Sequence, residues 1–137
     1  MFDLNKFANN IAVETEQGKK MAYAQLEKDA NAIAEVIKPR KFTFCLCENT
    51  LGSFVGYVAF MTHNIPTVLL DGSKDMGIVL GLANHYMPEY IWIPTSRVDE
   101  LGHGEPVFTY EDYTLINWQL PLKSIAKWEV LVLQWLR

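Results

Sequence analysis

The chain has 137 residues, half of them hydrophobic and a fifth charged, with a formal net charge of −4. This length suits one domain, and the hydrophobic fraction excludes an intrinsically disordered chain. The acidic balance argues against a nucleic-acid partner, since phosphate binding needs a basic surface. Neither an apolar run of about 20 residues, as a membrane span requires, nor a signal peptide is visible in the sequence. We therefore expect a cytoplasmic protein.

The first elements predicted along the chain are a β-hairpin and the helix that follows it. Ile11–Val13 and Met21–Leu26 flank a charged turn, which is the pattern of a hairpin leading into a helix. The helix is expected over residues 24–37. Its apolar positions fall on one helical face and are Leu26, Ala30, Ile33, Ala34 and Ile37.

An alternation of strands and helices follows. Apolar runs predict three parallel strands at Phe42–Cys47, Thr67–Leu70 and Tyr90–Ile93. The segments between them predict helices at Leu51–His63 and Asp75–Tyr86. The sequence thus predicts an α/β fold: a doubly wound, mostly parallel sheet with helices on both faces, preceded by a β-hairpin.

The last predicted elements follow the third parallel strand. A short helix is expected at Arg97–Leu101, with Thr95-Ser96 as its cap. Two further strands are expected at Val107–Tyr110 and Tyr113–Ile116, with a turn between them.

Polar residues follow two of the parallel strands, where ligands bind in open α/β sheets. Asn49 and Thr50 come after the first strand and Asp71 after the second, and these three are our candidate substrate-binding residues. A helix N-terminus after Thr50 offers free N–H groups to a ligand, and a carboxylate at Asp71 suits Mg²⁺ or a ribose. The alternative interpretation is that Asn49 or Thr50 caps the helix and that Asp71 stabilises its own turn.

Patterns for metal binding and catalysis are missing. The three histidines stand on different predicted elements, and Cys45 and Cys47 have no second cysteine pair, so no zinc motif is formed. The two cysteines are expected to point to opposite faces of their strand and to stay reduced. Neither a dinucleotide fingerprint nor a phosphate-binding P-loop occurs. We therefore predict no metal site and no catalytic residue in this chain.

Several ordered segments resemble the start of a known enzyme superfamily. MAYAQL looks like the element "(L/M)(T/S)Y.EL", and ENTLGSFVGYVAFMTHNIPTVLLD looks like "N..EFV.A.LA...AG...VPLD". Over residues 10–94 the order and spacing are similar to those of the adenylate-forming enzymes, which include acyl-CoA synthetases, peptide-synthetase adenylation domains and luciferases. The resemblance implies an AMP-forming ligase, which activates a carboxylate with ATP and Mg²⁺ and transfers the acyl group to a thiol.

The chain departs from that family in what it lacks. The family's Gly/Ser/Thr-rich phosphate loop, its aromatic-Thr/Glu motif, its ribose-binding Asp and its C-terminal Lys do not occur in these 137 residues. The resemblance therefore implies a truncated, N-terminal lobe over residues 1–117. Such a lobe holds no cofactor and is inactive alone, and its partner is the missing remainder of the enzyme or a second copy of the chain.

Residues 118–137 form an apolar tail with three of the four tryptophans. The tail is interpreted as a core or dimer-packing helix, as a membrane-surface helix, or as a frameshifted remnant. The third hypothesis rests on Trp128–Gln134, whose back-translation from the third base permits Gly-Ser-Thr-Gly-(Ser/Thr)-Pro, a sequence like the missing phosphate loop. In that case the tail was never selected to fold.

A second function from another class is a stand-alone, non-catalytic module with a flavodoxin-like fold, used for binding or assembly. In that case the apolar tail drives dimerisation and the strand-end crevice holds a small ligand or none. A coding sequence for the rest of the enzyme next to this one favours the ligase fragment, whereas a complete gene with a co-purifying partner favours the module.

Overall fold

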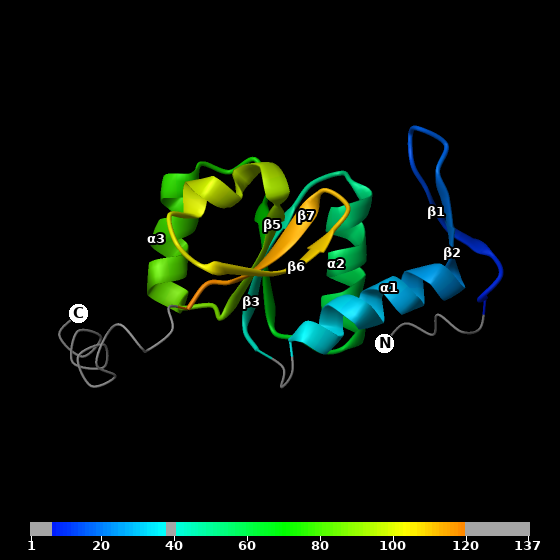
Figure 1. Cartoon of the computed structure of the whole chain (residues 1–137), viewed down its shortest axis with the longest axis horizontal. Helices are drawn as coiled ribbons and strands as arrows, with labels where there is room; N and C mark the ends of the chain where they lie inside the picture. Colours follow the sequence, from blue (N-terminus) through cyan, green and yellow to red (C-terminus); the bar gives the residue numbers. More distant parts are fainter. Residues whose placement is uncertain (1–6, 38–40, 120–137) are drawn as a thin grey trace.

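The computed structural model describes residues 7–37 and 41–119, which form a five-stranded sheet flanked by helices and a separate two-stranded hairpin (Figure 1). The hairpin consists of β1 (Ile11–Glu14) and β2 (Lys20–Ala22), and α1 (Tyr23–Val36) follows it directly. The remaining elements are β3 (Thr43–Cys47), α2 (Leu51–Thr62), β4 (Thr67–Asp71), α3 (Met76–Tyr86), β5 (Tyr90–Pro94), the 3₁₀ helix η1 (Thr95–Leu101), β6 (Glu105–Tyr110) and β7 (Tyr113–Asn117).

The five-stranded sheet is mixed and has the order β4-β3-β5-β7-β6. β3 pairs in parallel with β4 and with β5, as predicted, while β5 with β7 and β6 with β7 pair antiparallel. β6 and β7 run antiparallel because the short turn at Glu111 and Asp112 joins them. The α/β class, the three parallel strands and the preceding hairpin are confirmed.

Helices cover both faces of the sheet, and each face has its own hydrophobic cluster. Successive strand residues point to opposite faces. On β3, Cys45 accordingly faces α1 and α2, whereas Phe44 and Leu46 face α3 and η1. α1 has the predicted amphipathic pattern. The five predicted apolar positions are all buried: Leu26, Ala30, Ile33 and Ala34 in the helix and Ile37 at its C-cap.

Two glycines bring α2 close to the sheet. A Cβ atom at Gly56 would overlap the indole of Trp92, and one at Gly52 would lie 3.1 Å from Cδ1 of Tyr113. The close approach lets the fully buried Trp92 donate a hydrogen bond from Nε1 to the Gly52 carbonyl, at 3.1 Å. These glycines are required because any side chain would push the helix away from β5 and β7.

Two sequence-based expectations are wrong in detail. Cys45 and Cys47 do not point to opposite faces, because residues two apart in a strand share a face; their Sγ atoms are 3.8 Å apart. Thr95 does not cap η1, which has no side-chain cap; its hydroxyl is 2.7 Å from that of Thr114 on β7.

The start of the predicted tail is part of the fold. Trp118 is buried in the cluster beneath α3, and its backbone N–H donates to the Glu89 carbonyl at 3.0 Å. Residues 120–137, which carry the rest of the tail and the proposed frameshift, lie outside the described residues. Among the residues that are described, no helix is long and apolar enough to cross a membrane.

Candidate functional site

The carboxyl ends of β3 and β4 lie close together. The N–H of Gly72 donates to the Cys47 carbonyl at 2.7 Å, and a Cβ atom at Gly72 would lie 2.5 Å from Cγ of Glu48. A glycine is therefore needed at this position for the chain to leave β4 beside β3. Glu48 lies at the junction of the two strand ends.

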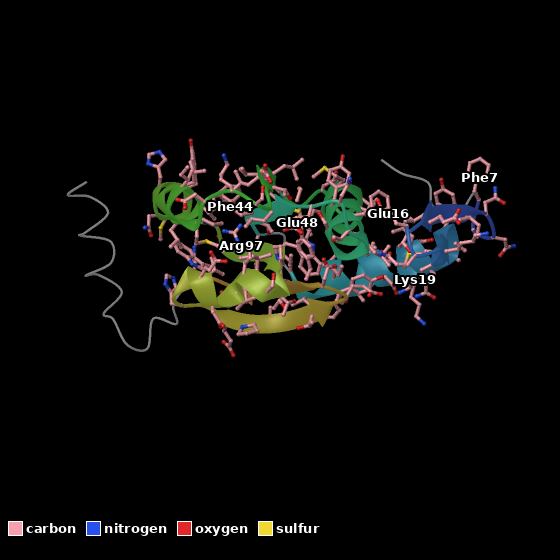
Figure 2. All side chains as sticks on the ribbon, turned by 90° about the horizontal axis from the view of Figure 1, so that it is seen from above. Phe7, Glu16, Lys19, Phe44, Glu48 and Arg97 are labelled. Carbon is pink, nitrogen blue, oxygen red and sulfur yellow. The ribbon has the colours of Figure 1, made fainter. Side chains whose placement is uncertain are left out.

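Arg97 on η1 fastens the loop after β4. Its guanidinium donates to the carbonyls of Gly72, at 2.5 Å, and Lys74, at 2.9 Å, and pairs with Glu100 at 3.0 Å. The hydrogen bond to Glu100 is the main cause that raises the pKa of Arg97, and the charge of Glu48 adds to it. Figure 2 shows Arg97 and Glu48 in the central part of the molecule. The Arg97 donors that face the loop are thus already used by protein acceptors.

The polar residues after β3 make local bonds. Thr50 is the N-cap of α2, and its Oγ1 accepts a hydrogen bond from the Ser53 N–H at 3.4 Å. Ser53 in turn accepts, through Oγ, a bond from the Glu48 N–H at 2.9 Å. Asn49 is exposed beside them. Thr50 therefore caps α2, as the alternative interpretation of the sequence held.

Asp71 stabilises its own turn. Its Oδ1 accepts from the backbone N–H of Ser73 at 2.9 Å and from its hydroxyl at 2.7 Å. These two bonds lower the pKa of Asp71, which is exposed. The carboxylate is therefore ionised, but one of its oxygens is engaged by Ser73.

An open cleft of about 780 Å³ lies between the hairpin, the start of α2 and the strand ends. Figure 2 shows Glu16 and Lys19 on the hairpin side, with Glu48 beyond α2. The residues that line the cleft are Val13, Glu14, Thr15, Glu16, Gln17, Lys19, Cys47, Glu48, Asn49, Thr50, Leu51, Ser53, Phe54, Tyr57, Leu69 and Glu111.

Acidic and apolar side chains both line the cleft. Four glutamates and one lysine line it, which gives a formal charge of −3. The lysine, Lys19, bridges the hairpin to the β6–β7 turn through an ion pair with Glu111 at 2.6 Å. Phe54 and Leu69 on the walls are 39% and 49% exposed. Such a surface repels phosphate groups and suits a cationic or amphipathic partner.

Cys47 contributes a thiol to the lining of the cleft. A hydrogen bond from Cys45 lowers the pKa of Cys47 to about 7, against the opposing effects of partial burial and of the Asp71 charge. The same interaction, with burial, raises the pKa of Cys45 well above its usual value. At pH 7 about half of the Cys47 side chains are therefore thiolates, while Cys45 stays a thiol.

The structure does not bring all three candidate residues together. Asn49 and Thr50 line the cleft, whereas Asp71 does not. Sequence reasoning missed the structural role of Arg97 and the contribution of the hairpin to the cleft. A basic residue just after a third parallel strand could have indicated the first. The second depends on tertiary packing and has no local signal. In the described part of the chain, no group of three or more His, Cys, Asp or Glu residues could hold a metal ion.

Comparisons with known proteins give a match at the level of the fold. No family model and no curated protein matches the sequence. Two solved structures of MatB from Rhodopseudomonas palustris, the apo form and the ATP-bound form, each match with a TM-score of 0.61 and 20% sequence identity. Each match covers 69% of this chain and 20% of the MatB chain. The chain thus shares an α/β fold with MatB and spans about a fifth of its length.

Proposed function

We propose that this chain is the N-terminal lobe of an adenylate-forming acyl or aminoacyl ligase. In the complete enzyme, a carboxylate would be activated with ATP and the acyl group passed to a thiol. By itself the lobe would not catalyse the reaction. The proposal includes the doubly wound arrangement of the full sheet and a cytoplasmic location.

The observation that carries the proposal is the ordered resemblance of the sequence to the opening region of ATP-using ligases. The fold, which matches a fifth of MatB, a protein whose structure is known with ATP bound, agrees with it. At 20% identity the structural match supports the fold, and the ordered motifs over residues 10–94 support the class of enzyme. The fold match and the motifs point to the same class of protein.

The cleft and its surroundings are not suited to bind a nucleoside triphosphate. The cleft has a formal charge of −3, and the nearby guanidinium of Arg97 is engaged by two carbonyls and Glu100. A triphosphate needs several free cations or backbone N–H groups. In this proposal, ATP and Mg²⁺ are therefore held by the remainder of the enzyme.

The role left to this lobe is to support and complete the enzyme. Asn49, Thr50 and Asp71 stay proposed as its substrate-facing residues, at the strand ends where α/β folds bind ligands. The open cleft, with Phe54 and Leu69 exposed, provides a surface for the remainder of the enzyme or for a second copy.

The DNA downstream of this coding sequence tests the proposal. We expect a reading frame, in phase or shifted, that encodes a Gly/Ser/Thr-rich phosphate loop and the other missing ligase motifs. Co-expression of that segment with this chain should give a complex. A locus without such a frame, combined with a different protein that co-purifies, would overturn the proposal in favour of the non-catalytic binding or assembly module.

A further inference from the structure

Cys45 and Cys47 form a close dithiol on β3. Their Sγ atoms are 3.8 Å apart, and when Cys47 is protonated its thiol also reaches the Cys45 carbonyl, at 3.5 Å. They are the only two cysteines in the sequence. Cys45 is fully buried, whereas Cys47 is partly exposed and lines the cleft. The pair therefore has one side open to small molecules.

The strand works against a disulfide between these two thiols. Residues two apart in an extended strand have Cα atoms about 6.6 Å apart, close to the upper limit of about 6.8 Å for disulfides. β3 cannot easily shorten, because it pairs with β4 on one side and β5 on the other. The sulfurs would have to approach from 3.8 Å to about 2.05 Å.

A single thiophilic atom fits between the sulfurs better than a direct bond. Two bonds of about 2.3 Å, the length of a Zn–S bond, reach sulfurs up to about 4.6 Å apart. The observed 3.8 Å separation lies within that reach, so the backbone of β3 need not move. The lowered pKa of Cys47 adds a thiolate, which is the form that binds soft centres.

The cleft also gives a path to the buried thiol. In the sheet register, Cys45 lies opposite Leu69 on β4, and the Leu69 side chain is 49% exposed and lines the cleft. β4 is an edge strand, so we expect a change of the Leu69 rotamer to cost little packing and to widen access to Cys45.

We propose that Cys45 and Cys47 form a binding site for a thiophilic centre that bonds two sulfurs, with trivalent arsenic as the representative ligand. The reaction with an arsenoxide consumes two thiols and releases one water: each sulfur replaces one As–O bond, and the two thiol protons leave with the oxygen. The oxidation state of arsenic does not change, so neither an oxidant nor a reductant is needed. This inference does not depend on the proposed ligase function.

The test uses the full chain and phenylarsine oxide. We expect one arsenic per chain in native mass spectrometry, loss of both thiols to later alkylation, and a rise in Tm, because a ligand that binds the folded state stabilises it. A dithiol should remove the arsenic, whereas a monothiol at the same concentration should not. Binding that lowers Tm would mean that only the unfolded chain reacts, and would overturn the proposal, as would the absence of an adduct.

Three variants make the test specific. Cys47→Ser alters a partly exposed residue, so the chain should fold, and it should lose the dithiol-dependent adduct. The double variant Cys45→Ser with Val68→Cys keeps two cysteines but places them on opposite faces, since Val68 packs against the other hydrophobic cluster; it should also lose the adduct. Leu69→Ala should form it severalfold faster. Retention of the tight adduct in the opposite-face variant would contradict the site.

Discussion

The two sides of α2 differ in how fully the described residues bury them. The inner side, with Gly52 and Gly56, is packed against the fully buried Trp92 and accepts its hydrogen bond. The outer side presents Phe54 and Tyr57 to an open cleft. The inner side of α2 is therefore part of the hydrophobic core, whereas the outer side stays exposed in the cleft.

The largest change in stability is expected from a substitution on the inner side of α2. Gly56→Ala places a methyl group on the Trp92 indole and should lower the free energy of unfolding by about 1–3 kcal/mol, the usual cost of overpacking a core. Urea denaturation measures it. The matched control is Gly81→Ala in α3, where a Cβ would meet nothing within 4 Å; it should stabilise by about 0.5–1 kcal/mol through helix propensity. Equal effects of the two substitutions would contradict the close packing of α2.

The next effect is the reactivity of Cys47 on the outer side. With a pKa of about 7 instead of 9.0, its thiolate fraction at pH 7 is about 50 times larger, and a lower intrinsic nucleophilicity offsets this about tenfold. Alkylation should therefore be about fivefold faster than for an ordinary thiol, with a midpoint near pH 7 that moves upward in Cys45→Ala. A midpoint near 9 in both proteins would exclude the thiol hydrogen bond.

The lowered pKa of Cys47 also makes the stability of the folded state depend on pH in a defined direction. A group whose pKa falls on folding stabilises the folded state above its unfolded pKa and loses that contribution as the pH falls through its folded pKa. For Cys47 the contribution is therefore full above about pH 9 and is lost as the pH falls through about 7. A matched Cys47→Ser variant should lack this slope in denaturation between those values.

Association tests whether the outer side is used by a second copy. We expect a homodimer or larger oligomer through the sheet edge or residues 118–137, because β4 is an edge strand and each 100 Å² of apolar surface buried contributes about 2.5 kcal/mol. Light scattering at micromolar concentration should give at least twice the 15.7 kDa chain mass. A clean monomer would show that the chain covers its own apolar surface.

The smallest effect concerns the ion pair that joins the hairpin to the β6–β7 turn. Lys19 and Glu111 are 56% and 40% exposed, and an exposed pair contributes at most about 1 kcal/mol. Lys19→Ala should therefore change the free energy of unfolding by less than about 0.5 kcal/mol, with Lys20→Ala on the same hairpin as the control. A loss several times larger would mean that the hairpin and the lobe unfold as one tightly coupled unit.

The sequence predicted the parts of the fold that periodicity controls. The buried face of α1 and the three parallel strands follow from local patterns of apolar residues. The cleft could not be predicted, because its lining combines residues of the hairpin, the start of α2 and Glu111, which are far apart in the sequence. The cysteine pair was open to prediction, since the period of a strand places Cys45 and Cys47 on one face. The role of Arg97 in fastening the loop after β4 was not predicted, because it depends on tertiary contacts with Gly72 and Lys74.

The central claim is that this lobe belongs to a ligase and lacks the groups that perform the chemistry. Carboxylate-dependent ATP–pyrophosphate exchange tests it most directly, measured for the purified chain alone and together with the segment encoded downstream. We expect no exchange by the chain alone and exchange by the combined preparation. An exchange rate that stays with the isolated chain through stringent purification, or a combined preparation that binds as a complex yet never exchanges, would contradict it.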